Sequence, residues 1–403
     1  MPFDVARARR AYPALAEGFV HFDGAAGTLV AEPVARAVAG VLGGAVSNRS
    51  TAFEPGRRAL RIVERARAAV GDLLGADPAG VVFGPSATAL TYTVARGLAE
   101  RWSPGDNVVV TRLDHDANVR PWVQLAQRAG VEVRWAAFDP GTGVLPTDAF
   151  RTLVDGRTRV VAVTAASNAI GTRPDVAAIA GIAHEAGAVV YVDGVHATAH
   201  LPVDVAALGA DFYVTSAYKW SGPHLSACVA APSRWEETAM LKLLPSPDAV
   251  PERFELGTPS FELLAGVEAA VEFLASLDGD AAGSQGSRRE RILRSMAAVH
   301  AYELELFERL LDGLKPVRVL PAPAGGCPTV SFRVDGQHPQ RTAELLGDQG
   351  ICVFSGDYYA AEYFIATGLR ESGGAVRAGI YHYTTADDVD RLVDAVGAIA
   401  QAR

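Results

Sequence analysis

A lysine and an aspartate end two successive apolar runs of the sequence. Lys219 follows the run DFYVTS within residues 211–224, and Asp193 ends the preceding run AVVYVD. A lysine at a strand end among aromatic and small residues is partly desolvated, which lowers the pKa of its amine and lets it attack a carbonyl. The alternatives are a surface lysine in a loop and an aspartate that caps a turn.

If both strand ends face one crevice, the two side chains have complementary chemistry. The amine would bond covalently to an aldehyde, and the carboxylate would keep a pyridine nitrogen protonated, as pyridoxal phosphate requires to act as an electron sink. The run 80–84 leads through a short turn to a predicted helix, whose free N–H groups and the Ser86 hydroxyl suit a phosphate. A serine that only caps the helix is the ordinary alternative. The segment GTGVLP at 141–146 lacks the last glycine of GxGxxG, so nicotinamide chemistry is disfavoured.

Further polar residues fall near the ends of predicted strands. His115 follows the run 107–112 and is placed to stack on an aromatic cofactor, although a lone histidine after a strand is more often structural. Four other residues are candidates by the same placement: Asn168, His196, Ser216 and Tyr218.

Short apolar runs alternate with alanine-rich amphipathic stretches between residues 30 and 235. The runs predicted as strands, each buried on both faces, are 80–84, 107–112, 132–138, 159–166, 188–193 and 211–216. Such alternation predicts an α/β fold with a large, mostly parallel, doubly wound sheet. Ligands bind beyond the carboxyl ends of the strands in these sheets, which is where the candidate residues lie.

A polar stretch rich in glycine and serine, residues 273–290, predicts a domain boundary. We therefore expect an N-terminal segment, 1–16, that packs on the small domain. A large domain, 17–272, would carry the cofactor. A smaller C-terminal α+β domain, 273–403, would contain a long helix from about 289, strands at 328–334 and 375–383, and a last helix from about 387.

Composition excludes several classes of protein. Thirty-seven basic and 46 acidic residues among 403 give a net charge of −9 without a basic block, so neither nucleic acid nor an anionic membrane is an expected partner. The three cysteines form no CxxC pair and no Cys/His cluster, so neither a disulfide framework nor a metal site is indicated. There is no leader-like apolar region and no run of roughly 18 apolar residues. We expect a cytoplasmic protein that binds small molecules.

Several motifs together resemble the class V aminotransferases, specifically the cysteine desulfurase-like branch of fold type I pyridoxal phosphate enzymes. They are LDHDAN at 113–118, SNAIGT at 167–172, DGVH at 193–196, SAYK at 216–219 and RFELGTPSFE at 253–262. The resemblance extends from HFDGAAG at 21–27 to DDVDRL at 387–392. It implies pyridoxal 5′-phosphate as cofactor, a homodimer with active sites at the interface, and an amino-acid substrate.

The resemblance also implies a role for each matching residue. Lys219 would bond to the cofactor, Asp193 would face the pyridine nitrogen, His115 would stack on the ring, and Asn168 would lie near its phenolic oxygen or the substrate. Arg377 would bind the substrate carboxylate, for which its guanidinium is well suited, and Ala26 would lie near the substrate. The phosphate would be bound by Ser86, Ala87, Ser216, Tyr218, His196 and, from a neighbouring subunit, Thr258.

One loop departs from the family pattern. Desulfurases of this type carry Arg-Thr-Gly-His-His-Cys, whose cysteine takes sulfur from the substrate as a persulfide. The corresponding residues 354–359 read FSGDYY, so Tyr359 stands in place of the cysteine. Cys352 lies in the apolar run 350–354, which predicts a buried strand residue, and Cys228 and Cys327 match no catalytic position.

The retained cofactor site without a sulfur nucleophile predicts a carbon–sulfur β-lyase acting on cysteine or a cysteine S-conjugate. Lys219 would be the acid and base, and Asp357, Tyr358 or Tyr359 would orient or protonate the leaving group. The alternatives are an aminotransferase, a decarboxylation-coupled deaminase and an epimerase. A catalytically silent scaffold is disfavoured by the presence of Lys219, Asp193 and Arg377.

Overall fold

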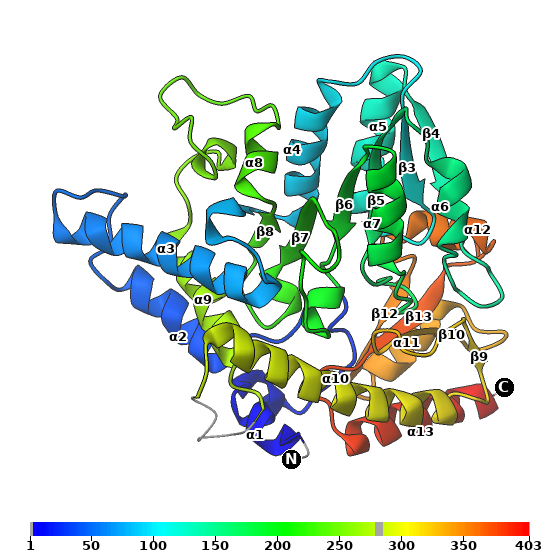
Figure 1. Ribbon diagram of the computed structural model, residues 1–403. Helices are drawn as coiled ribbons and strands as arrows, with labels where there is room; N and C mark the ends of the chain where they lie inside the picture. Colours follow the sequence, from blue (N-terminus) through cyan, green and yellow to red (C-terminus); the bar gives the residue numbers. More distant parts are fainter. Residues whose placement is uncertain (1–2, 279–284, 403) are drawn as a thin grey trace.

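A seven-stranded sheet forms the centre of the molecule in a computed structural model that describes residues 3–278 and 285–402 (Figure 1). The strand order is β2-β8-β7-β6-β5-β3-β4, and every strand runs parallel to the others except β8. The strands are β2 (Val81–Gly84), β3 (Asn107–Thr111), β4 (Glu132–Ala136), β5 (Thr158–Thr164), β6 (Val189–Asp193), β7 (Phe212–Ser216) and β8 (Ser226–Val229). The predicted doubly wound α/β fold is confirmed.

Helices cover both faces of this sheet. Alternate residues of β5 divide between two cores, with Val161 and Val163 in one and Val160 and Ala162 in the other, as a strand buried on both faces requires. The helices of this part are α2 (Glu32–Leu42), α3 (Glu54–Leu74), α4 (Ala87–Ala99), α5 (Arg120–Ala129), α6 (Asp148–Leu153), α7 (Val176–Glu185), α8 (Pro232–Glu236) and α9 (Phe261–Leu274). Residues from α3, α7 and α9 join the first core, and residues from α4, α5 and α8 join the second.

One expectation about the strands is wrong, and one strand was not anticipated. The strand predicted at 132–138 is not buried on both faces, since Glu132 is exposed and Arg134 is half-buried. It forms the edge of the sheet as β4, where only β3 pairs with it. The sequence also gave no indication of β8, a four-residue strand that directly follows a loop rich in small residues.

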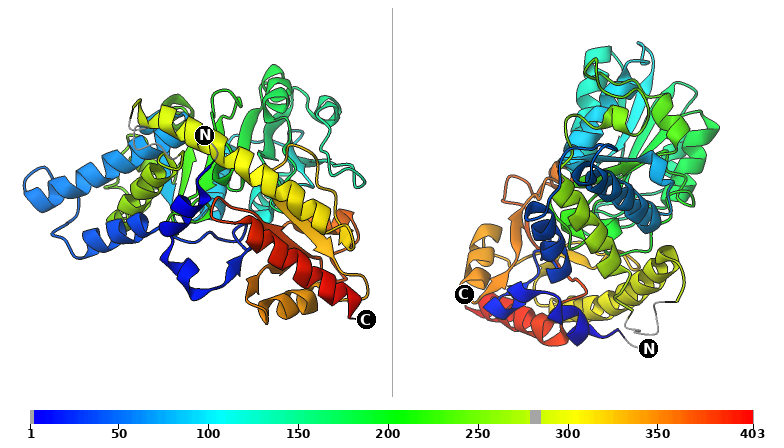
Figure 2. Two further views of the ribbon diagram at one scale, coloured as in Figure 1. Left: turned by 90° about the horizontal axis from the view of Figure 1, so that it is seen from below. Right: turned by 90° about the vertical axis from the view of Figure 1, so that its left-hand side faces the viewer.

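A second, antiparallel sheet with the order β12-β13-β10-β9 lies in the C-terminal part of the chain. Its strands are β9 (Arg318–Val319), β10 (Thr329–Arg333), β12 (Phe354–Gly356) and β13 (Ala375–Gly379). The helices here are α10 (Arg288–Gly313), α11 (Pro339–Gly347), α12 (Ala361–Ala366) and α13 (Ala386–Gln401). Capping boxes begin both α10, at Ser287, and α13, at Thr385. These two helices run alongside each other, as Figure 2 shows, and bury one common core with β10 and β13.

The beginning of the chain contacts its end. The first helix, α1 (Val5–Arg10), places Arg9 in an ion pair with Asp388 at 2.9 Å. The short strand β1 (Val20–His21) pairs in parallel with β11 (Ile351–Cys352). The predicted boundary region, 273–290, includes residues 279–284, which lie outside the described part of the chain. Within the described ranges, no helix has both the length and the apolar character that crossing a membrane requires.

Candidate active site

The carboxyl ends of β5, β6 and β7 open into a cleft of about 940 Å³. Asp193 is the last residue of β6, and Lys219 lies three residues beyond the end of β7, the strand that pairs with β6. The cleft is completed by the start of α4 and by the loop 354–359. Among the predicted residues, those that line it are Ala26, Ser86, Ala87, His115, Asn168, Asp193, His196, Ser216, Tyr218, Lys219, Asp357, Tyr358, Tyr359 and Arg377.

A substantial fraction of the Lys219 amine is unprotonated near pH 7. Burial lowers its pKa to about 7, and the positive charge of Arg377 acts in the same direction, while Asp193 partly offsets both. Its Nζ donates a hydrogen bond to the carbonyl oxygen of Ala25 and lies 5.0 Å from the centre of the Tyr218 ring. A lysine in this environment supplies the unprotonated amine that attack on an aldehyde needs.

Asp193 is a buried carboxyl group beside this amine. Burial raises its pKa to about 6, and a 2.9 Å hydrogen bond from the Val195 backbone N–H and the charge of Lys219 act against that shift. Gly194 allows the chain to turn here, because a Cβ at this position would overlap the ring of Tyr213. The carboxylate is therefore held at the floor of the cleft by a rigid strand end.

The start of α4 offers a site for an anion. Ser86 is the N-cap residue, and its Oγ accepts a hydrogen bond from the N–H of Ala89 at 3.1 Å, whereas Ala87 and Thr88 line the cleft. Ser216, at the end of β7, contributes a hydroxyl that lies 2.7 Å from the Ser226 hydroxyl. A helix N-terminus with adjacent hydroxyl groups is a favourable environment for a phosphate.

Two buried polar atoms of the cleft wall have no hydrogen-bond partner among the described residues: Nδ1 of His196 and Oδ1 of Asn168. Nε2 of His196 is hydrogen-bonded to Oγ1 of Thr329 at 3.1 Å. The Asn168 amide donates to the carbonyl oxygen of Tyr358 at 3.0 Å. Burial keeps the pKa of His196 well below its ordinary value, so its ring is neutral. Unsatisfied buried polar atoms are costly, and a polar ligand in the cleft would satisfy these two.

His115 is also neutral, and its orientation is fixed. Its pKa is lowered to about 4 by burial, with Lys219 and Arg377 adding to the shift. Nδ1 accepts a 3.0 Å hydrogen bond from the Ala117 N–H, which leaves the ring proton on Nε2. The ring stacks on that of Tyr359, with a centroid distance of 5.5 Å and an interplanar angle of 26°.

Arg377, in the middle of β13, is a buried cation without a carboxylate partner among the described residues. It donates to the carbonyl oxygen of Asn168 at 2.9 Å, and its guanidinium lies 4.5 Å from the centre of the Tyr358 ring. Burial lowers its pKa from the usual value. A carboxylate that enters the cleft would gain an ion pair here that the protein itself leaves unmade.

The loop 354–359 crosses the cleft in an unusual conformation. Gly356, Tyr358 and Tyr359 have positive φ angles of 118°, 48° and 59°, and such angles are uncommon for tyrosine. Asp357 forms an ion pair with Arg370 at 3.2 Å, and the Asp116 N–H donates to the carbonyl oxygen of Tyr359 at 2.6 Å. The hydroxyl of Tyr358 donates to the Ala375 carbonyl oxygen, whereas the side chain of Tyr359 is 72% exposed.

The cysteines lie outside the cleft. Cys228 and Cys327 are buried, and burial raises the pKa of Cys327 to about 12 and that of Cys228 further. The expectation of a buried Cys352 is wrong, because it is half-buried. It follows the buried Ile351 in the two-residue strand β11, and successive side chains of a strand point to opposite faces. Thr258 is exposed and does not line the cleft of its own chain.

Several residues of the cleft were not anticipated. Tyr92 on α4 and Arg120 and Gln124 on α5 line its outer part, together with Asp116 and Phe354. Nothing in the sequence distinguishes Tyr92, Arg120 and Gln124 from ordinary surface residues of a helix. Their place in the cleft follows only from the packing of α4 beside α5. Across the described ranges, no three histidine, cysteine or carboxylate side chains gather where they could hold a metal ion.

Comparison with known proteins extends these observations. The Aminotransferase class-V family matches residues 20–392. An uncharacterized protein of Mycobacterium tuberculosis (strain CDC 1551 / Oshkosh) is 36% identical over 99% of this chain and 100% of its own. A probable cysteine desulfurase of Pseudomonas aeruginosa is 34% identical over 94% of this chain and 92% of its own.

Solved structures of cysteine desulfurases have the same fold. The enzyme CsdA from Escherichia coli matches with a TM-score of 0.86 and 27% identity, over 99% of this chain and 98% of its own. The apo enzyme from Thermococcus onnurineus NA1 matches with a TM-score of 0.89 and 25% identity, over 100% of this chain and 99% of its own.

Fold and cleft together define a fold type I pyridoxal phosphate enzyme. The chain belongs to the class-V aminotransferase family and is similar to its cysteine desulfurases. Pyridoxal 5′-phosphate is the cofactor of these enzymes, and the cleft suits it. A neutral amine, a buried carboxylate, a helix N-terminus and two buried polar atoms without partners converge on one space.

Proposed function

We propose that the protein is a carbon–sulfur β-lyase that acts on cysteine or a cysteine S-conjugate and forms no persulfide on a cysteine of its own. One observation carries this proposal. Tyr359 lines the cleft, and none of the three cysteines does. By its sequence motif, the segment 354–359 corresponds to the sulfur-accepting loop of desulfurases, with Tyr359 in the place of their cysteine. Without a thiol at this place, sulfur leaves with the group to which it is attached.

The cofactor would be bound by residues that already face the cleft. Bound there, it would act as a sink for the electron pair left on the substrate Cα. Lys219 would hold it covalently, Asp193 would face its pyridine nitrogen, and the imidazole of His115 would lie against its ring once the Tyr359 ring gives way. Its phosphate would be bound at the start of α4 and by neighbouring side chains, namely Ser86, Ala87, Ser216, Tyr218 and His196.

Arg377 would bind the substrate carboxylate in the cleft, with Asn168 and Ala26 beside it. Lys219 would then take the Cα proton, since a group whose free pKa is about 7 exchanges protons readily near neutral pH. The C–S bond would break with its electron pair on sulfur, giving a thiol after protonation. The aminoacrylate that remains would react with water to give pyruvate and ammonia.

Tyr359 is our candidate for the acid that protonates the departing sulfur. The hydroxyl of Tyr358 is bonded to the Ala375 carbonyl oxygen, and the carboxylate of Asp357 is paired with Arg370. Through these contacts, both side chains stabilise the conformation of the loop. The exposed Tyr359 side chain lines the cleft without such a hydrogen bond among the described residues, so its phenol is available to the substrate.

We also propose a homodimer in which Thr258 contributes to the partner's site. Thr258 lies in an exposed segment outside its own cleft, and nearby apolar side chains are exposed, namely Leu241, Leu243, Leu244 and Leu256. Exposed apolar clusters of this kind often mark interfaces.

A product screen tests the function. Amino acids and cysteine S-conjugates are incubated with the loaded enzyme, and mass spectrometry monitors pyruvate, keto acids, aldehydes and inverted substrate, with Lys219→Ala as the control. We expect pyruvate and a thiol from one or more cysteine derivatives. A keto acid of the intact substrate would indicate transamination, an aldehyde decarboxylation-coupled deamination, and an inverted amino acid epimerisation; any of these without pyruvate rejects the lyase.

A further inference from the structure

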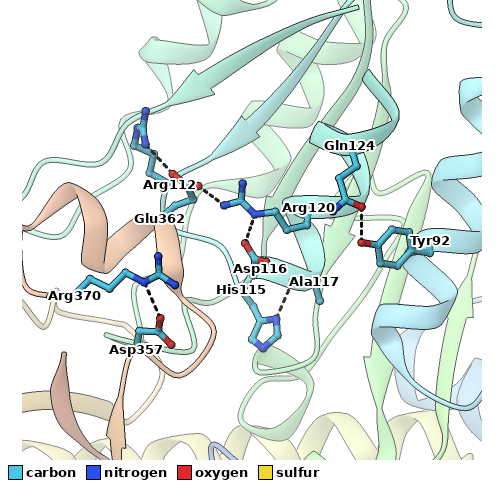
Figure 3. A network of polar contacts seen from close by, with 10 residues as sticks. All are labelled: Tyr92, Arg112, His115, Asp116, Ala117, Arg120, Gln124, Asp357, Glu362 and Arg370. Atoms are coloured by element: carbon cyan, nitrogen blue, oxygen red, sulfur yellow. Dashed lines mark hydrogen bonds and ion pairs between the residues drawn. The ribbon is translucent and has the colours of Figure 1, made fainter. Parts of the chain in front are cut away.

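The outer part of the cleft, away from Lys219, has a wall of its own. We define this outer wall by six cleft-lining residues: Tyr92, Asp116, Arg120, Gln124, Phe354 and Asp357. Figure 3 shows how most of them lie: Tyr92 and Gln124 on one side, Asp357 on the other, and Asp116 and Arg120 between them above His115. A substrate held by its carboxylate at Arg377 would direct the group on its sulfur toward this wall.

The cation of the outer wall is already neutralised. Arg120 donates to Asp116 at 2.6 Å and also to Glu362. Glu362 is in turn bound by Arg112 at 2.8 Å. A carboxylate on the sulfur substituent would therefore meet a guanidinium whose charge is already balanced by Asp116 and Glu362, and both of these carboxylates would repel it (Figure 3).

The carboxylate of Asp357 is likewise occupied by Arg370, at 3.2 Å. A cationic substituent would therefore also have to compete with an existing ion pair. Neither sign of charge finds a free counter-ion on the outer wall among the residues that the structure describes. The outer wall therefore disfavours both anionic and cationic substituents.

Neutral and aromatic surface makes up the rest of this region. Phe354 is 47% exposed although it lies within strand β12, and Tyr359 beside it is exposed as well. The hydroxyl of Tyr92 donates to Oε1 of Gln124 at 2.9 Å, so the phenol proton and this amide oxygen already have partners. Exposed aromatic faces gain stability when an apolar group covers them.

The size of the cleft points the same way. Its volume of about 940 Å³ includes the space that the cofactor would fill around Lys219 and, beyond it, the space along the outer wall. Cysteine, with a single sulfur beyond its Cβ, would leave the outer wall without a contact. A larger substituent on sulfur would reach it.

We propose that the outer wall binds a bulky, uncharged aromatic group, so that the substrate class is the neutral aromatic thioethers of cysteine and neither free cysteine nor conjugates that end in a carboxylate. This inference rests on the proposed lyase activity for its substrate and on the contacts of the outer wall for its selectivity.

The experiment compares four compounds: l-cysteine, S-propyl-l-cysteine, S-(2-carboxyethyl)-l-cysteine and S-benzyl-l-cysteine. The second and third differ only in a terminal methyl or carboxylate group. Pyruvate release gives kcat/KM with the loaded enzyme, and titration calorimetry gives Kd with loaded Lys219→Ala protein, which does not complete turnover. We expect S-benzyl to be favoured over cysteine, and S-propyl over S-carboxyethyl, by at least about tenfold in each measure.

Two variants test the assigned contacts. Glu362→Gln removes one of the two carboxylates that hold Arg120, and it should raise the ratio of S-carboxyethyl to S-propyl about tenfold; Asp390→Asn, in an exposed ion pair with Arg309, should leave that ratio unchanged. Phe354→Ala should weaken S-benzyl more than S-propyl, and Phe354→Tyr should restore the difference. Because Phe354 is half-exposed, its truncation leaves the core intact. The two Phe354 variants therefore test whether the outer wall binds an aromatic group even if Glu362→Gln does not fold.

The outcomes separate the two proposals. Pyruvate from S-carboxyethyl at least as efficiently as from S-propyl, or S-benzyl bound no tighter than cysteine, overturns the inference and leaves the lyase standing. If no compound yields pyruvate, the lyase is rejected. In that case the order of the four Kd values on Lys219→Ala protein tests the selectivity of the outer wall without turnover.

Discussion

The ring of Tyr359 lies against the imidazole of His115, with centroids 5.5 Å apart and planes inclined by 26°. The contact joins the loop 354–359 to the segment after β3, and a 2.6 Å hydrogen bond from the Asp116 N–H to the Tyr359 carbonyl oxygen reinforces it. A tyrosine with positive φ thus stands over the histidine that the sequence predicted to face the cofactor. Placing the cofactor against His115 requires the Tyr359 side chain to turn, so this residue is the natural place to probe the chemistry.

Changing Tyr359 to cysteine places a thiol at the position that the sequence motif matches to the sulfur-accepting cysteine of desulfurases. We expect Tyr359→Cys to take up sulfur from cysteine, since the residue lines the cleft on a loop tied to Asp116. The measurement is intact-protein mass spectrometry for one added sulfur atom that a reductant removes. Tyr359→Ser, which has the same size without the thiol, should gain none. Persulfide on the unaltered protein at Cys352 would contradict the proposed function.

Lys219 should react with the cofactor aldehyde at lower pH than an ordinary lysine. Burial and Arg377 lower its pKa to about 7, and only the neutral amine attacks a carbonyl. The rate of covalent capture by cofactor-free protein, followed by the absorbance of the lysine adduct, should rise through about pH 7 and level off above it. Arg377→Met removes a positive charge from the cleft and should move the midpoint upward. A midpoint near that of free lysine would rule out the desolvated amine.

Asp193 should be needed for activity, but its buried charge should lower the free energy of unfolding of the cofactor-free protein near neutral pH. Its pKa is raised to about 6, chiefly by burial, so its contribution to stability is full below about pH 4 and is lost as the pH rises through 6. Asp193→Asn should therefore stabilise cofactor-free protein by about 1–3 kcal/mol at pH 7, measured by urea unfolding, while activity falls sharply. Unchanged stability at pH 7, or a gain that is equal at pH 4 and pH 7, would argue against a buried ionised carboxylate.

Arg377→Lys should separate binding from chemistry. Lysine keeps the charge, but it lacks the planar fork that binds a carboxylate through two bonds and the flat face that lies over Tyr358. We expect KM to rise about 10- to 100-fold with a smaller change in kcat. Arg333→Lys on the neighbouring strand β10 is the matched control, because Arg333 bonds to Ser372 and Gly374 and does not line the cleft. An equal loss in both variants would mean that Arg377 only supports the fold.

The large sheet could be predicted because buried parallel strands have a simple pattern. Their central residues, such as 108–110 and 189–192, are apolar throughout, and helices cover both of their faces. β4 was predicted as a buried strand although it contains Glu132 and Arg134, and these charged residues are accommodated because the strand lies at the edge of the sheet. β8 reads SACV and has a single β-branched residue, so its composition does not indicate a strand.

The inner site could be predicted because strand ends place it. Asp193 is the last residue of its strand and Lys219 lies three residues beyond the end of the next, so finding the strands located both side chains. The outer wall could not be predicted, since Tyr92 and Gln124 meet only when α4 packs beside α5. The pairing of His115 with Tyr359 depends on the positive φ angles of the loop, and tyrosine gives no indication of such backbone.

The parallel pairing of β1 with β11 has a consequence for how the chain assembles. Val20 is synthesised more than three hundred residues before its partner Ile351. Closing so long a loop is a slow step, and until then the buried side chains of Val20 and Phe22 lack their core. A nascent chain released or stalled before β11 would present this apolar segment to chaperones and proteases, so production of the protein should depend on synthesising the segment that carries β11 without delay.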